Sequence, residues 1–96
     1  MKVVFNNCYG GFGLSDKALE MISSIKGYYV KESDFSSAES RIDPDLVYVV
    51  EKLGKEANTS YSNLQIKEIS EPYRIEEYDG RESVKHPSDY NFVYFL

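Results

Sequence analysis

The residue types most suited to chemistry lie in a glycine-rich turn near the start of the chain, Cys8-Tyr9-Gly10-Gly11-Phe12-Gly13-Leu14-Ser15. Glycine allows the backbone to adopt positive φ angles and to approach a ligand closely. If a helix begins at Ser15, the loop amides and the helix dipole converge on an anion such as a phosphate, and Tyr9 and Phe12 can stack on a base. The glycine spacing matches neither the P-loop nor the Gly-x-Gly-x-x-Gly fingerprint. The alternative is a tight strand-to-helix turn with both aromatic rings in the core.

A pair of glutamates forms the second candidate site. Residues 73–86 predict a β-hairpin, because Asp79-Gly80 suits a two-residue type I′ turn. The resulting register places Ile75 opposite Val84, Glu77 opposite Glu82, Tyr78 opposite Arg81 and Arg74 opposite Lys85. Two facing carboxylates are unfavourable unless a cation, a ligand's hydroxyls or amine, or a shared proton relieves the repulsion. Alternatively, both are solvated near the end of the hairpin, or a bulge shifts the register.

The other polar candidates are single residues. Arg41 precedes a predicted helix start and is the basic residue best placed to contact a ligand phosphate. In one interpretation Cys8 and His86 act as a nucleophile and its base. In the other, Cys8 is simply a small buried residue. One cysteine and one histidine are too few for a zinc site, so we expect no metal and no cofactor.

Capping signals define the first helix. Ser15 is a good N-cap and Gly27 a good stop, which predicts a helix over about residues 15–26. Residues 28–30 are then a candidate strand. The serine-rich residues 31–41 have no hydrophobic period and indicate a mobile loop.

The second helix has clear start signals. Asp43 caps it and Pro44 occupies its first position. We expect Gly54 to lie in the helix interior and to allow close packing on a sheet. Asn58 would end the helix in a left-handed conformation.

The remaining elements complete a small α/β (α+β) domain. Apolar runs predict strands at residues 3–5, 64–69 and 90–96, the last paired internally or with a second subunit. Together with the hairpin they predict a two-layer domain over residues 1–96. Its mixed sheet of about four to six strands is packed by two helices and includes a C-terminal β-hairpin.

Composition excludes several classes of function. The 96 residues suit one domain, and the 42 % hydrophobic content supplies a single core. The net charge is −5 and the 11 basic residues are scattered, so we expect no general nucleic-acid binding. No apolar stretch approaches the roughly 20 residues that span a bilayer, and no signal peptide is evident. A single cysteine suits a reducing compartment. We therefore expect a cytoplasmic protein without membrane contact.

Three blocks of the sequence resemble a family of small phage-encoded proteins described as hypothetical. Residues 6–15 match Asn-x-Cys-Tyr-Gly-Gly-Phe-Gly-Leu-Ser, and residues 41–58 match Arg-x-Asp-Pro-x-Leu-Val-x-Val-Val-Glu-x-Leu-Gly-x-x-Ala-Asn. Residues 75–82 match Ile-Glu-Glu-Tyr-Asp-Gly-x-Glu. The resemblance implies a phage protein in the cytoplasm of a host bacterium and supplies no catalytic residues. After Glu82 the chain departs from the family, whose members continue with Trp-Val and a basic end.

The leading hypothesis is a non-catalytic binding protein that sequesters a small anionic nucleotide-like ligand. The chain is similar in kind to small oligomeric phage proteins that capture nucleotide second messengers of bacterial defence systems, so we also expect a homo-oligomer. The expected ligand contacts are Cys8, Tyr9, Gly10, Gly11, Phe12, Gly13, Ser15, Arg41, Glu77 and Glu82. One alternative is an inhibitor or adaptor that binds a host bacterial protein through an acidic, tyrosine-rich surface. The other is a small hydrolase of a nucleotide signal that uses the two glutamates.

Overall fold

Four strands form two separate antiparallel pairs in the computed structural model, which describes residues 1–89. β1 (Lys2–Asn6) pairs with β2 (Leu64–Glu68), and β3 (Arg74–Tyr78) pairs with β4 (Arg81–Lys85) in a hairpin. The α+β class is confirmed. The single mixed sheet is wrong, because no backbone ladder joins the two pairs within the described part of the chain. The strand predicted at residues 90–96 lies outside the described residues.

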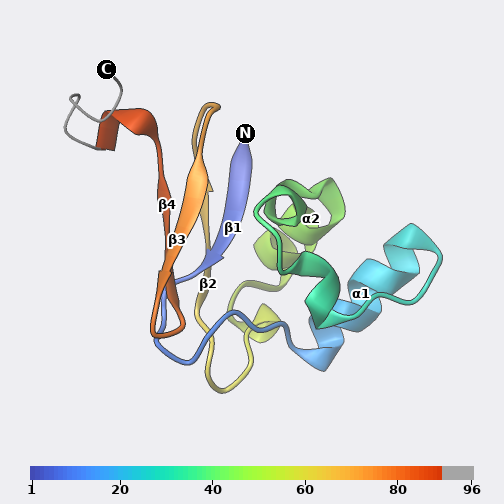
Figure 1. Cartoon of the computed structure of the whole chain (residues 1–96). Helices are drawn as coiled ribbons and strands as arrows, with labels where there is room; N and C mark the ends of the chain where they lie inside the picture. Colours follow the sequence, from blue (N-terminus) through green and yellow to red (C-terminus); the bar gives the residue numbers. More distant parts are fainter. Residues whose placement is uncertain (90–96) are drawn as a thin grey trace.

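The two helices lie on one side of β1 and the hairpin lies on the other (Figure 1). Helix α2 (Pro44–Leu53) is next to β1, and helix α1 (Asp16–Lys26) lies beyond α2. The order across the molecule is therefore hairpin, β1–β2 pair, α2 and α1. This order places the β1–β2 pair between the hairpin and both helices.

Both helices begin at the side-chain caps that the sequence predicts. Ser15 Oγ accepts a hydrogen bond from the Ala18 N–H at 3.1 Å, and Asp43 Oδ1 accepts one from the Asp45 N–H at 2.8 Å. At the other end of α1, Gly27 adopts a φ of +79°. The first helix is thus confirmed from cap to cap.

The second helix is shorter than predicted. It ends at Leu53 because Gly54 adopts a φ of +56°, and a 3₁₀ helix, η3 (Gly54–Ala57), follows. A Cβ added to Gly54 would meet no atom within 4 Å, so the predicted close packing there is wrong. Asn58 is extended and not left-handed. Its Oδ1 accepts a hydrogen bond from the Leu64 N–H at 2.7 Å and so fixes the start of β2.

The segment between the helices differs from the prediction. Residues 28–30 form no strand, and the predicted mobile loop contains two 3₁₀ helices, η1 (Glu32–Phe35) and η2 (Glu39–Ile42). Phe35 is buried and belongs to the core. Helices of a single turn leave no 3.6-residue period in the sequence, which explains why the pattern indicated a loop.

The hydrophobic core lies between the β1–β2 pair and the helices. Its buried members are Val4, Leu14, Ala18, Ile22, Val30, Phe35, Leu46, Val47, Val49, Val50, Ala57 and Leu64. Among the described residues, none from β3 or β4 belongs to this cluster. Other contacts must therefore attach the hairpin to the rest of the protein.

Lys26 joins the end of α1 to the start of α2. Its Nζ lies 2.8 Å from Asp43 Oδ2 and 2.9 Å from Asp45 Oδ2. Hydrogen bonds to Asp43 and then to Asp45 raise the pKa of Lys26. Burial by itself would raise the pKa of the Asp43 carboxyl, but the hydrogen bonds from Lys26 and from the Asp45 amide hold that pKa below its usual value.

Lys26→Met is expected to lower the free energy of unfolding at neutral pH, because it leaves two neighbouring carboxylates without their cation. The pKa of Asp43 is lower in the folded protein than in the unfolded chain, where it is about 4. The ionised Asp43 therefore stabilises the fold above that pH, and this contribution is lost as the pH falls through the folded-state pKa. The difference between wild type and variant should therefore shrink between about pH 7 and about pH 3 in urea denaturation.

The control for this prediction is Lys52→Met, which removes an exposed cation from α2. It should change the stability little at either pH. If the destabilisation by Lys26→Met were the same in acid as at neutral pH, the ion pairs would not be its cause.

Candidate functional site

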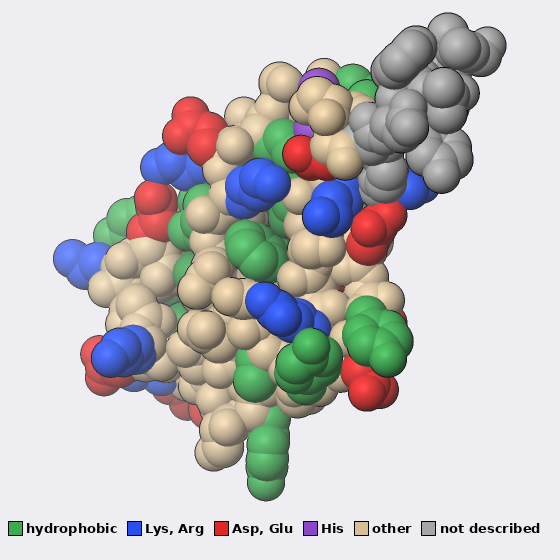
Figure 2. Space-filling view, turned by 90° about the vertical axis from the view of Figure 1, so that its left-hand side faces the viewer, with side chains coloured by type: hydrophobic (Ala, Val, Ile, Leu, Met, Phe, Trp, Pro, Cys, Tyr) green, Lys and Arg blue, Asp and Glu red, His purple; other side chains and the backbone are tan. Residues whose placement is uncertain are grey.

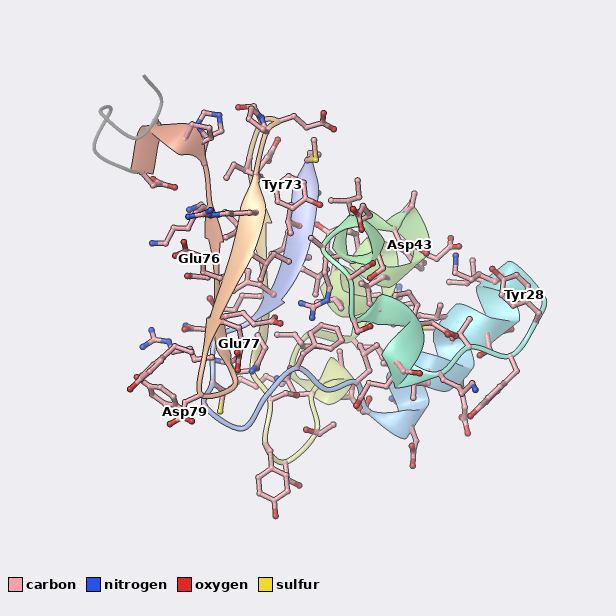
Figure 3. All side chains as sticks on the ribbon, viewed as in Figure 1. Tyr28, Asp43, Tyr73, Glu76, Glu77 and Asp79 are labelled. Atoms are coloured by element: carbon pink, nitrogen blue, oxygen red, sulfur yellow. The ribbon has the colours of Figure 1, made fainter. Side chains whose placement is uncertain are left out.

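The turn of the β3–β4 hairpin has the predicted type and register. Asp79 and Gly80 have φ angles of +54° and +91°, as a type I′ turn requires. Glu77 lies opposite Glu82. Glu77 Oε2 accepts a hydrogen bond from the Gly80 N–H at 2.6 Å, so this carboxylate caps the turn. Figure 3 shows Glu76 and Glu77 along β3 and Asp79 at the tip of the hairpin.

Glu82 has a cation partner from a distant part of the chain. Arg41 Nη1 and Nη2 lie 2.6 and 2.8 Å from its two carboxylate oxygens. The Arg41 side chain is 3 % exposed and that of Glu82 is 8 % exposed. A buried charge needs such a partner. Arg41 is therefore the cation that relieves the repulsion between Glu77 and Glu82.

The Arg41–Glu82 pair also closes the free edge of β1. In an antiparallel pair, every second residue of a strand turns its N–H and C=O groups toward the partner strand. In β1, the N–H and C=O groups of Val4 and Asn6 therefore face away from β2. Glu82 Oε1 accepts a hydrogen bond from the Asn6 N–H at 2.9 Å. Arg41 Nη1 donates to the Val4 carbonyl at 3.4 Å. These two side chains supply the edge contacts that a third strand would otherwise make, and they attach the hairpin to β1.

The side chain of Asn6 brings three loops together. Its Nδ2 donates to the Gly80 carbonyl at 2.9 Å and to the Cys8 carbonyl at 2.6 Å, while its Oδ1 accepts from the Asn63 N–H at 2.8 Å. A Cβ added to Gly80 would lie 2.3 Å from the Tyr9 carbonyl oxygen. The hairpin tip, the glycine turn and the loop before β2 therefore meet at Asn6.

Arg41 is enclosed by the protein and does not face solvent. Its Nε donates to the Phe35 carbonyl, and its guanidinium lies 3.6 Å from the centre of the Phe12 ring. Arg41 was predicted to contact a ligand phosphate, and Phe12 was predicted to stack on a base. In this structure the two residues contact each other, and the Arg41 side chain is buried.

The glycines of the turn serve different purposes. A Cβ added to Gly10 would lie 2.0 Å from the Tyr61 carbonyl oxygen, and one added to Gly13 would lie 3.0 Å from Thr59 Cγ2. Gly11 has a φ of +95° and open space around it. Gly10 and Gly13 therefore allow the turn to pack against the loop before β2, whereas Gly11 is needed for its backbone conformation.

The two amides directly ahead of α1 have partners within the chain. The Leu14 N–H donates to Glu32 Oε1 at 2.8 Å, and the Ser15 N–H donates to the Ala57 carbonyl at 2.9 Å. Ser15 Oγ donates to the Glu56 carbonyl at 2.6 Å while it caps α1. The carboxylate of Glu32 thus accepts from one of the amides near the start of α1.

A pocket of about 660 Å³ lies along the hairpin near its turn, a volume typical of small-molecule sites. We call it the hairpin pocket, and its lining residues are Phe5, Asn7, Tyr9, Glu76, Glu77, Tyr78, Arg81, Glu82 and Ser83. Figure 2 shows the molecule from the hairpin side, where hydrophobic and tyrosine side chains (green) lie beside Lys and Arg side chains (blue).

Arg81 is held in place at the edge of the hairpin pocket. Its Nε donates to Asn7 Oδ1 at 2.8 Å. Its guanidinium carbon lies 5.7 Å from the centre of the Tyr9 ring, within the range of a cation–π contact. The Tyr9 ring is itself exposed. A guanidinium for an anion and a ring for a planar group are therefore next to each other.

Three of the predicted ligand residues line the hairpin pocket, namely Tyr9, Glu77 and Glu82. The lining does not include Cys8, Gly10, Gly11, Phe12, Gly13, Ser15 or Arg41. Arg81 was not among the predicted contacts. The hairpin register already placed it opposite Tyr78, on the face away from the glutamates, and this was the signal that could have identified it.

Comparisons with protein-family models, with curated proteins and with solved structures find no match to this chain. Within residues 1–89, no group of three or more His, Cys, Asp or Glu side chains is placed to hold a metal ion. Over the same residues, no helix has the length and apolar character needed to cross a membrane. The function must therefore be inferred from the geometry of the hairpin pocket.

Proposed function

We propose that this protein is a non-catalytic binding protein that sequesters a small anionic nucleotide-type ligand in the hairpin pocket. The observation that carries the proposal is the arrangement of Tyr9 and Arg81 at one pocket of about 660 Å³. These two residues come from the glycine turn and β4, and each suits a different part of a nucleotide. In the phage context that the sequence resemblance implies, the protein would deplete a nucleotide signal of its host.

Each of the two residues has a distinct role in this proposal. Arg81 donates to the phosphate through its Nη nitrogens, because its Nε is already engaged with Asn7. The exposed ring of Tyr9 stacks on the base. In this scheme Arg81 takes the phosphate role first given to Arg41.

The first test is native mass spectrometry of the purified protein, which reports the number of subunits and any co-purified small molecule. Calorimetric titration with nucleoside mono- and diphosphates, cyclic dinucleotides and ADP-ribose derivatives then identifies the ligand class. Arg81→Ala should weaken binding of the best ligand by about tenfold or more, since it removes a charge-assisted contact to the phosphate.

The matched control is Arg74→Ala, which removes the same type of side chain from the other end of the hairpin. Arg74 is exposed, pairs with Glu76 at 2.9 Å and does not line the hairpin pocket. Equal losses in both variants would indicate a general effect of net charge. The proposal fails if no member of the panel binds the wild-type protein.

A protein–protein inhibitor is the second candidate, and a specific observation favours it. Tyr9, Tyr61 and Tyr78 are 60 %, 72 % and 76 % exposed, and the segments that carry them meet near the hairpin tip. Tyrosine and arginine are common in the centres of protein interfaces. Tyr61 does not line the hairpin pocket, so Tyr61→Ala should spare nucleotide binding but weaken binding to a protein partner.

A further inference from the structure

The β1–β2 pair has a second outer edge, along β2, and this edge differs from that of β1. The Asn7 N–H donates to the Asn63 carbonyl at 2.8 Å, so the odd-numbered residues of β2 turn their backbone groups toward β1. The N–H and C=O groups of Leu64, Ile66 and Glu68 therefore point away from β1, along the outer edge of β2.

Most of these outward groups have no partner in the described part of the chain. The Leu64 N–H donates to Asn58 Oδ1 at 2.7 Å. Within residues 1–89, the Ile66 N–H, the Ile66 carbonyl and the Glu68 N–H make no hydrogen bond. Ile66 is half-buried and Glu68 is exposed. Side chains close the edge of β1, whereas the edge of β2 is left open.

β2 lacks the usual protection of an open edge strand. Proline, a β-bulge and lysines along the edge are common devices against pairing with another chain. β2 contains no proline, and its register with β1 runs without a bulge. Its one lysine, Lys67, donates to the Val84 carbonyl at 3.1 Å and so reaches toward the hairpin. The edge of β2 is therefore open to a further strand.

The order of residues in β2 makes this edge complementary to itself. In a two-fold dimer the strands run antiparallel and pair about one residue and the same residue of the second copy. When Ile66 is that residue, the Ile66 N–H and C=O groups bond those of the copy, and each Glu68 N–H bonds a Leu64 carbonyl. Gln65 then lies opposite Lys67, and no two like charges of β2 face each other.

The other registers centred in β2 are less favourable. Pairing about Lys67 places two lysines opposite each other, and pairing about Glu68 does the same with two glutamates. Pairing about Gln65 or Leu64 makes fewer backbone bonds within β2, because the Leu64 N–H is already bonded to Asn58. The backbone groups and the charges therefore favour the register centred on Ile66.

We propose that the open edge of β2 is a homodimer interface, in which β2 of a second copy pairs in the register centred on Ile66. The two β1–β2 pairs then form one four-stranded antiparallel sheet. Residues of β2 do not line the hairpin pocket, so each copy keeps its own pocket. A contact between single strands is a small interface, so we expect a dissociation constant on the order of 10 to 100 µM.

Variants of Gln65 test the register by sedimentation velocity over a range of protein concentrations. Gln65 is exposed, so its substitution should not unfold the protein. Gln65→Glu places a carboxylate opposite Lys67 in both halves of the dimer and should lower the dissociation constant by about threefold or more. Gln65→Lys places two lysines opposite each other and should raise the dissociation constant by about the same factor.

A general effect of charge predicts the opposite order. The chain has a net charge of −5, so an added lysine would reduce repulsion between two copies and an added glutamate would increase it. Ser24→Lys adds the same charge to an exposed position of α1 and should not weaken the dimer. Tighter association of Gln65→Lys than of Gln65→Glu would therefore overturn the proposal.

Hydrogen exchange locates the interface. The Ile66 and Glu68 amides should gain protection as the protein concentration rises, whereas the Gln65 amide faces β1 and should be protected at every concentration. A dimer in which the Ile66 and Glu68 amides stay unprotected would place the interface elsewhere and overturn the proposal. A protein that stays monomeric up to about 1 mM would also overturn it and leave the edge to a partner of another kind.

Discussion

Arg41→Met is expected to lower the free energy of unfolding by about 3 to 5 kcal/mol, because it leaves the buried Glu82 carboxylate without its cation. Glu82→Leu should have a similar effect, since it leaves a buried guanidinium without its anion. A domain of this size has a total stability of about 5 to 15 kcal/mol, so each loss is a large fraction of the whole. Urea denaturation followed by circular dichroism measures both variants.

The double variant Arg41→Met/Glu82→Leu gives the more informative result. In many proteins two well-packed apolar side chains can replace a buried ion pair without loss of stability. Here the pair also bonds the Asn6 N–H and the Val4 carbonyl, so its removal leaves two backbone groups of β1 without partners. We therefore expect the double variant to remain about 2 kcal/mol or more less stable than wild type.

Hydrogen exchange reports on this edge directly. In the double variant the Asn6 amide should lose its protection, because its acceptor is gone. The Asn7 amide donates to the Asn63 carbonyl and should stay protected. Lys17→Met breaks an exposed ion pair and should cost less than about 1 kcal/mol. A double variant with wild-type stability and a protected Asn6 amide would contradict the edge-closing role.

Gly10→Ala is expected to destabilise the protein by about 3 kcal/mol or more. Its new Cβ would lie 2.0 Å from the Tyr61 carbonyl oxygen, and two backbone segments would have to separate to accommodate it. Gly11→Ala adds a methyl group that meets no atom within 4 Å. It should cost only about 1 kcal/mol, from the positive φ of that residue.

This pair of variants separates packing from ligand contact within one turn. Both are measured by thermal and urea denaturation, and ligand titration is added for Gly11→Ala, which we expect to fold. The packing explanation predicts that Gly10→Ala is clearly the less stable of the two. Equal stabilities would contradict the close approach to Tyr61.

Local signals in the sequence were sufficient for the local structure. Ser15 and Asp43 cap the two helices as predicted, because an N-cap depends only on residues within the first turn. The Asp79-Gly80 turn fixes the whole hairpin register for the same reason, since a two-residue loop leaves one alignment of the strands. These elements could be derived without knowledge of the rest of the fold.

The elements that failed depend on distant parts of the chain. The sequence showed that Glu77 faces Glu82, but the cation that resolves this contact, Arg41, lies in a segment that looked like a loop. The predicted single sheet failed for a related reason. Polar side chains, and not a neighbouring strand, bond the outer edge of β1, and no hydrophobic pattern indicates such an arrangement.

The candidate site was predicted only in part. Tyr9 and Glu77 were identified from the glycine turn and the hairpin, and both line the hairpin pocket. Arg81 was missed as a ligand contact because its proximity to Tyr9 requires the hairpin tip to pack against the glycine turn. That contact joins residues about 70 positions apart and is a product of tertiary folding.

The way the edge of β1 is closed has a consequence for the newly made chain. β1 can pair with β2 once the middle of the sequence has been synthesised, but Glu82, which closes the other edge, follows Asn6 by 76 residues. Until the hairpin emerges from the ribosome, the outer Asn6 N–H lacks its Glu82 acceptor, and an open strand edge can pair with another chain. Incomplete chains that end before β4 are therefore the form of this protein most prone to aggregate.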